Sequence, residues 1–280
     1  MNTLAAREGL QPEASSYFSC SAISYLCARM GIFRKIWAVY AVLLFLALLF
    51  LAGFPVLLLN MTLAPGERAL RRNIFFLHHI FTPVFLMLVG IRVRVDGADK
   101  LDKTQSYLIV GNHSSALDFI ANAEAFPGVF RFLAKQELHR VPVFGWVVKK
   151  MCLTVDRTSA MSRARSVVLL KQQLAAGWSI FIYPEGGRNR TAEPLAPFYD
   201  GAFRIAIQTQ APIAVQTIVN MKQISATAKS IDLRPGTVYI VWDGPIQTTG
   251  MTAADIPALK EQVRQLMLNR LNKLNSQRAV

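Results

Sequence analysis

Acidic residues and cysteines are scarce in this sequence. It has 17 Asp and Glu against 31 Lys and Arg, which gives a formal net charge of +14 over 280 residues. The three cysteines, Cys20, Cys27 and Cys152, have no spacing typical of metal ligands and make no disulfide framework. Internal repeats and low-complexity tracts are also missing. The cysteine usage therefore indicates a reducing compartment, and no metal site is predicted.

Apolar side chains, in contrast, are abundant, and they occur together with the basic ones. Apolar residues make up 52% of the chain, although its pI is about 10.1. A soluble nucleic-acid-binding protein is usually basic but less apolar, and this chain has no aromatic-studded basic motif and no reading helix, so no nucleic-acid partner is predicted. The combination indicates a protein that lies on a membrane with anionic headgroups, or one that handles anionic amphiphiles.

Two apolar segments occupy the first 90 residues. Residues 36–59 form a run of 24 without a charged side chain, long enough to cross a hydrocarbon layer, and residues 74–90 form a shorter run of 17. Basic residues flank the first run on both sides, which favours a re-entrant helical pair with both ends on the cytoplasmic face over a plain two-span hairpin. Core helices of a soluble protein are the third alternative. We interpret residues 1–90 as a membrane-associating helical region.

After Gly90 the pattern changes to short apolar strands that alternate with helical segments. Strands are predicted at residues 92–95, 107–110, 130–134, 152–155, 179–183, 213–219 and 238–242, and helices at residues 116–125, 143–151, 162–176, 201–209 and 254–275. Such alternation predicts that residues 91–280 form an α/β domain, with a layered mixed sheet flanked by helices. A functional site is expected at the ends of the strands.

One strand leads directly into a histidine and an aspartate. The run Tyr107–Val110 ends at Gly111-Asn112, His113 follows, and Asp118 lies in the first turn of the next predicted helix. The carboxylate could hold the imidazole in one tautomer and leave its other nitrogen free to accept a proton. In the alternative interpretation, Ser115-x-x-Asp118 is a capping box and Asp118 only binds a free backbone N–H group.

A second strand runs into Tyr183-Pro184-Glu185-Gly186-Gly187-Arg188. Glycines let a backbone bend sharply, and a guanidinium can grip phosphate oxygens with two parallel hydrogen bonds, so this loop is a candidate anion site. Glu185 could orient Arg188 or bind a substrate hydroxyl; a solvated surface turn is the alternative. Residues 131–171 add nine Lys or Arg and only two acids, and Lys135 and Arg157, at predicted strand ends, are the two expected to point inward.

Taken in order, these stretches resemble the glycerolipid acyltransferase family, the 1-acyl-glycerol-3-phosphate (lysophosphatidate) acyltransferases and their relatives. His113 and Asp118 are similar to the family's HX4D block, and Tyr183 to Arg188 to its third block. The second block corresponds to Lys135-Gln136-Glu137-Leu138 with Pro142, Gly145 and Arg157, and the fourth to Ala211-Pro212-Ile213-Ala214-Val215. The resemblance extends from about Arg92 to Asp243.

The resemblance implies direct transfer of a fatty acyl chain from a thioester to the sn-2 hydroxyl of lysophosphatidic acid, giving phosphatidic acid. His113 would be the general base and Asp118 its orienter. Family roles place the acceptor phosphate near Lys135, Arg157 and Arg188, while Glu185 and Gly186 would shape that pocket and Pro212 would close its wall. Acyl-CoA or acyl-carrier protein would be the donor, without a further cofactor. The partners would be the lysophospholipid and membrane lipids, at an inner membrane with the catalytic domain on its cytoplasmic side.

The chain departs from the family pattern at two positions. Gly187 replaces the usual Thr of the third block, and Asp200 stands where the family often has Lys. Both changes leave open another acceptor, such as glycerol-3-phosphate, another lysophospholipid or a lyso-aminolipid. A non-catalytic basic membrane-binding module is the alternative from a different class. An acyl-enzyme on Ser114 or Ser115 is disfavoured, because helix capping suffices to explain Ser115.

Overall fold

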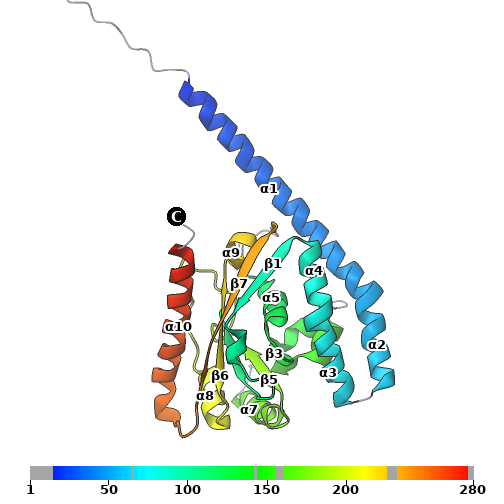
Figure 1. Cartoon of the computed structure of the whole chain (residues 1–280), viewed down its shortest axis with the longest axis vertical. Helices are drawn as coiled ribbons and strands as arrows, with labels where there is room; N and C mark the ends of the chain where they lie inside the picture. Colours follow the sequence, from blue (N-terminus) through cyan, green and yellow to red (C-terminus); the bar gives the residue numbers. More distant parts are fainter. Residues whose placement is uncertain (1–14, 65, 142–143, 156–159, 226–231, 277–280) are drawn as a thin grey trace, which may run out of the picture.

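Within the residues that the structure describes, the sheet of the α/β domain has seven strands in the order β1-β7-β6-β2-β5-β3-β4. The computed structural model describes residues 15–64, 66–141, 144–155, 160–225 and 232–276 (Figure 1). The strands are β1 (Ile91–Asp96), β2 (Leu108–Gly111), β3 (Phe130–Lys135), β4 (Leu153–Val155), β5 (Ser179–Ile182), β6 (Ile213–Val219) and β7 (Gly236–Ile246). Only β6 and β7 pair antiparallel, whereas the other five pairings are parallel. The predicted mixed sheet is confirmed, and every predicted strand is present.

Helices cover both faces of this sheet, which is why its central strands are apolar on both sides. On one face, α7 (Ala160–Ala175), α8 (Gly201–Thr209) and α10 (Ile256–Ser276) pack on side chains such as Leu108 and Val110. On the other face, α5 (Asp118–Ala125) covers Ile109 and its neighbours. The short helices α6 (Phe144–Met151) and α9 (Met221–Ile224) complete the domain.

The N-terminal segments form two antiparallel helical rods beside the domain (Figure 1). The first rod comprises α1 (Ser15–Leu48), a π-helical turn η1 (Leu49–Gly53) and α2 (Phe54–Leu63). The second comprises α3 (Glu67–Phe76), the π-helical turn η2 (Leu77–Phe81) and α4 (Thr82–Leu88). The second rod contributes Phe85 and Leu86 to the domain core, so it packs against the α/β domain rather than standing apart. The boundary at residue 90 stays a prediction, in the short link between α4 and β1.

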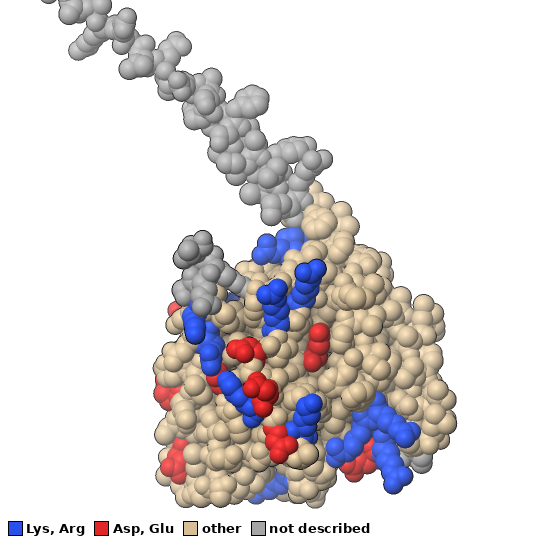
Figure 2. Space-filling model, viewed as in Figure 1, with Lys and Arg blue, Asp and Glu red and all other residues tan. Residues whose placement is uncertain are grey.

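The first rod is mostly uncovered. In the part of the chain that the structure describes, Gly31–Leu63 is one helix long and apolar enough to cross a membrane, and only 17% of its most apolar window is buried. Large exposed side chains along it include Ile36, Leu43, Phe50, Leu51 and Leu63. Figure 2 shows the same feature. On this face the surface over the rods is mostly uncharged between the basic residues next to the grey segment above and the basic group at the lower right. A helix of this length with an uncovered apolar surface is typical of membrane association.

Candidate active site

His113 and Asp118 meet at the carboxyl end of β2. The strand ends at Gly111, residues 112–117 form a loop, and α5 begins at Asp118. The Nδ1 atom of His113 lies 2.9 Å from an Asp118 carboxylate oxygen. A carboxylate only accepts hydrogen bonds, so Nδ1 is the donor in this contact, and in the neutral form of the ring Nε2 is the acceptor. The His113 side chain is 18% exposed, whereas Asp118 is fully buried.

Asp118 also binds the loop that carries His113. The same carboxylate oxygen accepts hydrogen bonds from the backbone N–H groups of Ser114 and, at 2.7 Å, of Ser115. Asp118 therefore orients the imidazole and caps the backbone at once, and the two interpretations of the sequence are compatible. Because residues 115–117 form a turn, α5 starts at Asp118 rather than at the predicted residue 116.

Glu185 ties two loops together. Its carboxylate accepts a hydrogen bond of 2.6 Å from the backbone N–H of His113 and one of 2.8 Å from that of Ala196. Burial raises the pKa of Glu185, and these two hydrogen bonds oppose the shift. Among the described residues no ion pair joins Glu185 to Arg188. The hypothesis that Glu185 orients Arg188 is therefore wrong, since both its oxygens bind backbone amides.

The loop of residues 183–193, here the glycine-arginine loop, lies against the loop of residues 112–117, here the histidine loop. Gly186 has a φ of 69°, a left-handed conformation that favours glycine, and the backbone N–H of Asn189 donates to the His113 carbonyl over 2.7 Å. Arg188 and Arg190 are exposed. Nothing lies within 4 Å of a Cβ added at Gly187, so no steric contact in the structure explains glycine in place of threonine there.

Within its described residues, the structure does not place Lys135, Arg157 or Pro212 in contact with His113. Lys135 is the last residue of β3, but its side chain and all of Arg157 lie outside the described part of the structure. Pro212 precedes β6 and its carbonyl accepts from the Leu108 N–H group, at the end of β2 opposite to His113. Four or five residues of extended strand separate those levels, roughly 15 Å. The expectation that Pro212 closes the wall of the site is wrong, because parallel pairing puts it at the far edge of the sheet.

Asp200 forms an ion pair with Lys260, a residue distant in sequence. Its carboxylate lies 2.7 Å from the Lys260 ammonium group on α10. This ion pair lowers the pKa of Asp200, mainly through the hydrogen bond from Lys260. The aspartate that stands where the family often has lysine is therefore paired with a lysine from another element.

Three further residues lie near the site, and none of them has a role predicted from the sequence, although Tyr183 stands in the third block. Tyr183 stacks its ring on the His113 imidazole, with centroids 4.0 Å apart and an interplanar angle of 16°. Asn122 donates a hydrogen bond of 3.1 Å to the Tyr183 hydroxyl. Lys222 on α9 reaches the carbonyls of Thr191 and Glu193 in the glycine-arginine loop, at 3.3 and 3.4 Å. Each contact depends on elements that only the fold brings together.

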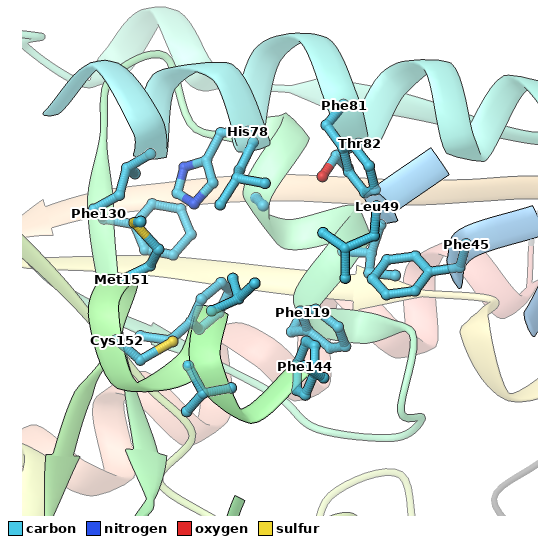
Figure 3. A pocket seen from close by; sticks show the side chains of 17 residues that line it. Phe45, Leu49, His78, Phe81, Thr82, Phe119, Phe130, Phe144, Met151 and Cys152 are labelled. Carbon is cyan, nitrogen blue, oxygen red and sulfur yellow. The ribbon is translucent and has the colours of Figure 1, made fainter. Parts of the chain in front are cut away.

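An apolar cavity of about 90 Å³ lies between the helical rods and the domain (Figure 3). Its lining comes from both rods and from α5, β3 and α6: Phe45, Leu49, Ile74, Leu77, His78, Phe81, Thr82, Phe119, Ile120, Ala123, Phe130, Phe132, Phe144, Val147, Val148, Met151 and Cys152. Figure 3 shows Phe119 and Phe144 on one side and His78, Phe130 and Met151 on the other. His113 is not part of the lining, but Tyr183, on which it stacks, also stacks on Phe132 at 6.4 Å.

Metal ligands do not gather in the described residues, where no group of three or more His, Cys, Asp or Glu is placed to hold an ion.

Comparison with known proteins finds similarity to acyltransferases. A family model described as "Acyltransferase" matches residues 92–219. The chain is 32% identical to the human 1-acyl-sn-glycerol-3-phosphate acyltransferase alpha over 196 residues, 68% of this chain and 67% of that protein. It is also 32% identical to the 1-acyl-sn-glycerol-3-phosphate acyltransferase of Borreliella burgdorferi over 192 residues, 68% of this chain and 76% of that protein.

A solved structure has the same fold. The crystal structure of the 1-acyl-sn-glycerophosphate acyltransferase PlsC from Thermotoga maritima superposes with a TM-score of 0.74. The superposition covers 88% of this chain and 98% of that one, at 19% sequence identity. The shared architecture includes most of the N-terminal helical region, since 88% of the chain is more than the α/β domain alone.

Proposed function

Because this chain belongs to the 1-acyl-sn-glycerol-3-phosphate acyltransferase family, we propose that it transfers a fatty acyl group from a thioester to the free hydroxyl of lysophosphatidic acid, forming phosphatidic acid. The acceptor oxygen attacks the thioester carbonyl as Nε2 of His113 takes the hydroxyl proton. The carbon–sulfur bond then breaks, and the imidazolium returns that proton to the departing thiolate. A positioned base of this kind contributes roughly 10²–10⁴ to the rate.

The observation that carries this proposal is the 2.9 Å contact between Nδ1 of His113 and Asp118, which favours the tautomer with its proton on Nδ1 and a free Nε2. An alcohol is a weak nucleophile until its proton is removed, and this nitrogen belongs to a side chain that is partly exposed at the edge of the sheet. The neighbouring serines support direct transfer rather than an acyl-enzyme. Ser114 Oγ lies 3.3 Å from Asp118, and Ser115 Oγ accepts a hydrogen bond from the Leu117 N–H group.

The purified full-length protein tests the proposal directly. We expect phosphatidic acid to form when lysophosphatidic acid is supplied with palmitoyl-CoA or palmitoyl-acyl-carrier protein, and the ratio of the two rates identifies the donor. An acceptor panel of glycerol-3-phosphate, lysophosphatidylcholine and a lyso-aminolipid identifies the preferred acceptor. Absence of thioester-dependent acylation with every pair would leave the non-catalytic membrane-binding alternative.

Arg188 is proposed to bind the acceptor phosphate. Its side chain is exposed, and no ion pair with it occurs within the described ranges. The loop that carries it contacts His113 through the Asn189 N–H group, which puts the guanidinium on an element adjoining the base. A guanidinium binds phosphate oxygens with two parallel hydrogen bonds.

Replacing Arg188 with alanine should raise KM for lysophosphatidic acid about tenfold to a hundredfold, the range expected for a lost charge-assisted hydrogen bond. KM for the acyl donor should change little. Steady-state kinetics with each substrate varied in turn checks this, with Arg264→Ala, at a half-buried arginine of α10, as the control. Equal activity of the wild-type enzyme on an uncharged monoacylglycerol would contradict phosphate recognition by Arg188.

The apolar cavity is proposed to hold the acyl chain of the donor. Its lining is almost entirely hydrocarbon, and Phe132 in its wall stacks on Tyr183, the ring that adjoins His113. An acyl chain that enters this space leaves water and contacts side chains of the rods and the domain together.

Filling the cavity should therefore change chain preference. Ala123 lies on α5 and lines the cavity, and phenylalanine at this position should lower the rate with palmitoyl thioester at least about tenfold relative to octanoyl thioester. The ratio of the two kcat/KM values is the measurement, and Ala254→Phe at an exposed position is the control. An unchanged ratio would mean that the chain binds elsewhere.

The first rod is proposed to hold the enzyme at the inner membrane, with the α/β domain on the cytoplasmic side. The exposed apolar residues of Gly31–Leu63 support this arrangement, as do the basic residues Arg34 and Lys35 near its start. Lipid acceptor and acyl chain would then both reach the site from the bilayer surface.

A further inference from the structure

The ring of Tyr183 stacks on the imidazole of the proposed base. The phenol and the His113 imidazole are nearly parallel, at 16°, with centroids 4.0 Å apart. Tyr183 directly follows β5, and His113 follows β2. Because β2 and β5 are parallel neighbours, both rings lie at the carboxyl-terminal edge of the sheet. Stacked aromatic pairs resist rotation about the side-chain bonds, because any tilt loses contact area.

A single helix binds both rings. Asp118 and Asn122 are four residues apart on α5, so their side chains lie one turn apart on one face. Asp118 binds Nδ1 of His113 over 2.9 Å, and Asn122 donates to the Tyr183 hydroxyl over 3.1 Å. Both α5 side chains are fully buried, which leaves them little freedom to move. The helix therefore grips the stacked pair at two points.

We propose that Tyr183, held by Asn122, is a positioning residue for the base. Its ring is the platform that keeps the imidazole in the plane in which Nε2 faces the acceptor hydroxyl. Its π-face also stabilises the imidazolium that forms as the hydroxyl proton is taken, an attraction that is absent while the ring is neutral. This inference rests on the proposed acyl transfer, and it adds a group that acts through His113 without touching the reacting atoms.

The environment keeps the phenol in the form this role needs. Burial raises the pKa of Tyr183 well above its ordinary value, and the negative charge of Asp118 raises it further. A neutral phenol hydroxyl accepts the hydrogen bond from Asn122 without adding a second anion beside Asp118. The same ring stacks on Phe132 at 6.4 Å and 16°, so it also links the imidazole to the wall of the apolar cavity.

Variants at Tyr183 separate the ring from the hydroxyl. Tyr183→Leu removes the stack and should lower kcat about tenfold to thirtyfold with KM for both substrates within twofold of wild type. Tyr183→Phe loses the hydrogen bond from Asn122 but keeps the stacked ring, which carries the positioning role, and should retain at least half of the wild-type kcat. Tyr199→Leu, at a tyrosine that is 70% exposed, is the matched control and should be unchanged. Circular dichroism and the thermal midpoint establish that each variant is folded.

A readout that does not depend on turnover keeps the test separate from the proposed function. In protein labelled at histidine, the His113 ring protons should show an upfield ring-current shift that persists in Tyr183→Phe and is lost in Tyr183→Leu. The positioning role is overturned if folded Tyr183→Leu keeps kcat within twofold, if its loss lies only in KM, or if Tyr183→Phe falls as far as Tyr183→Leu. If the wild type shows the ring-current shift but forms no phosphatidic acid, the proposed function fails and the positioning role fails with it, while the stack itself is verified.

Discussion

Replacing His113 with alanine should lower kcat by at least about a hundredfold and leave the protein folded. The rate loss follows from the removal of the base, for which positioned proton transfer contributes roughly 10²–10⁴. The fold should persist because the long-range hydrogen bonds of residue 113 come from its backbone. Its N–H group donates to Glu185 and its carbonyl accepts from Asn189, and alanine supplies both groups unchanged.

The measurement is phosphatidic acid formation by the purified variant at saturating lysophosphatidic acid and acyl donor, with its thermal midpoint recorded in parallel. His79→Gln is the matched control, because His79 also uses its ring for one hydrogen bond, to the Gly128 carbonyl, and lies away from the site. Glutamine retains a donor for that carbonyl, so activity should stay at the wild-type level. If folded His113→Ala retains more than a tenth of the wild-type rate, His113 is not the base.

Replacing Asp118 with asparagine should have an effect of similar size, at least about a hundredfold on kcat, together with a loss of stability. Three donors converge on one carboxylate oxygen of Asp118: Nδ1 of His113 and the N–H groups of Ser114 and Ser115. Asparagine has one acceptor oxygen where aspartate has two. Its NH₂ group takes the place of one carboxylate oxygen, either the one that accepts the three donors or the one that faces Ser114 Oγ. The imidazole can then take its other tautomer, with the proton on Nε2, which is useless as a base.

The stability change has a separate cause. Asp118 is fully buried, so a donor that loses its acceptor there has no water to replace it, at a cost of about 1–3 kcal/mol. Chemical denaturation of Asp118→Asn measures the loss in free energy of unfolding. The kcat of the folded protein measures the loss in catalysis. Asp102→Asn, in an exposed turn that binds Thr104, is the control and should change neither by much. A folded Asp118→Asn with near wild-type kcat would reduce Asp118 to a cap of the backbone.

Some of the site could be predicted because its members are close in sequence. His113 and Asp118 are five residues apart, across one strand end and one helix start, so local geometry alone brings them within 2.9 Å. The predicted strands could likewise be placed because strands buried on both faces read as short apolar runs. The predicted start of α5 is two residues too early, because Ser115 Oγ accepts a hydrogen bond from the Leu117 N–H group and residues 115–117 form a turn.

Sequence spacing does not predict a residue's neighbours where these depend on strand pairing. Pro212 belongs to the fourth block of the family pattern, yet it precedes a strand parallel to β2 and so lies at the edge opposite to His113. Glu185 and Arg188 are three residues apart in one loop, but the carboxylate binds the backbone of His113, which is 72 residues away. Spacing along the chain carries no information about such partners.

By itself, the sequence determined the alternation of strands and helices, the apolar N-terminal run, and a base with its orienting carboxylate, because each depends on side chains a few residues apart. Tertiary structure alone decided that β7 lies between β1 and β6, that Glu185 binds the histidine loop, and that Tyr183 stacks on the imidazole. The same holds for the apolar cavity, which needs both helical rods and the domain. These features bring together residues that are distant in the chain, and the free energy that selects them comes from burying all of their surfaces at once.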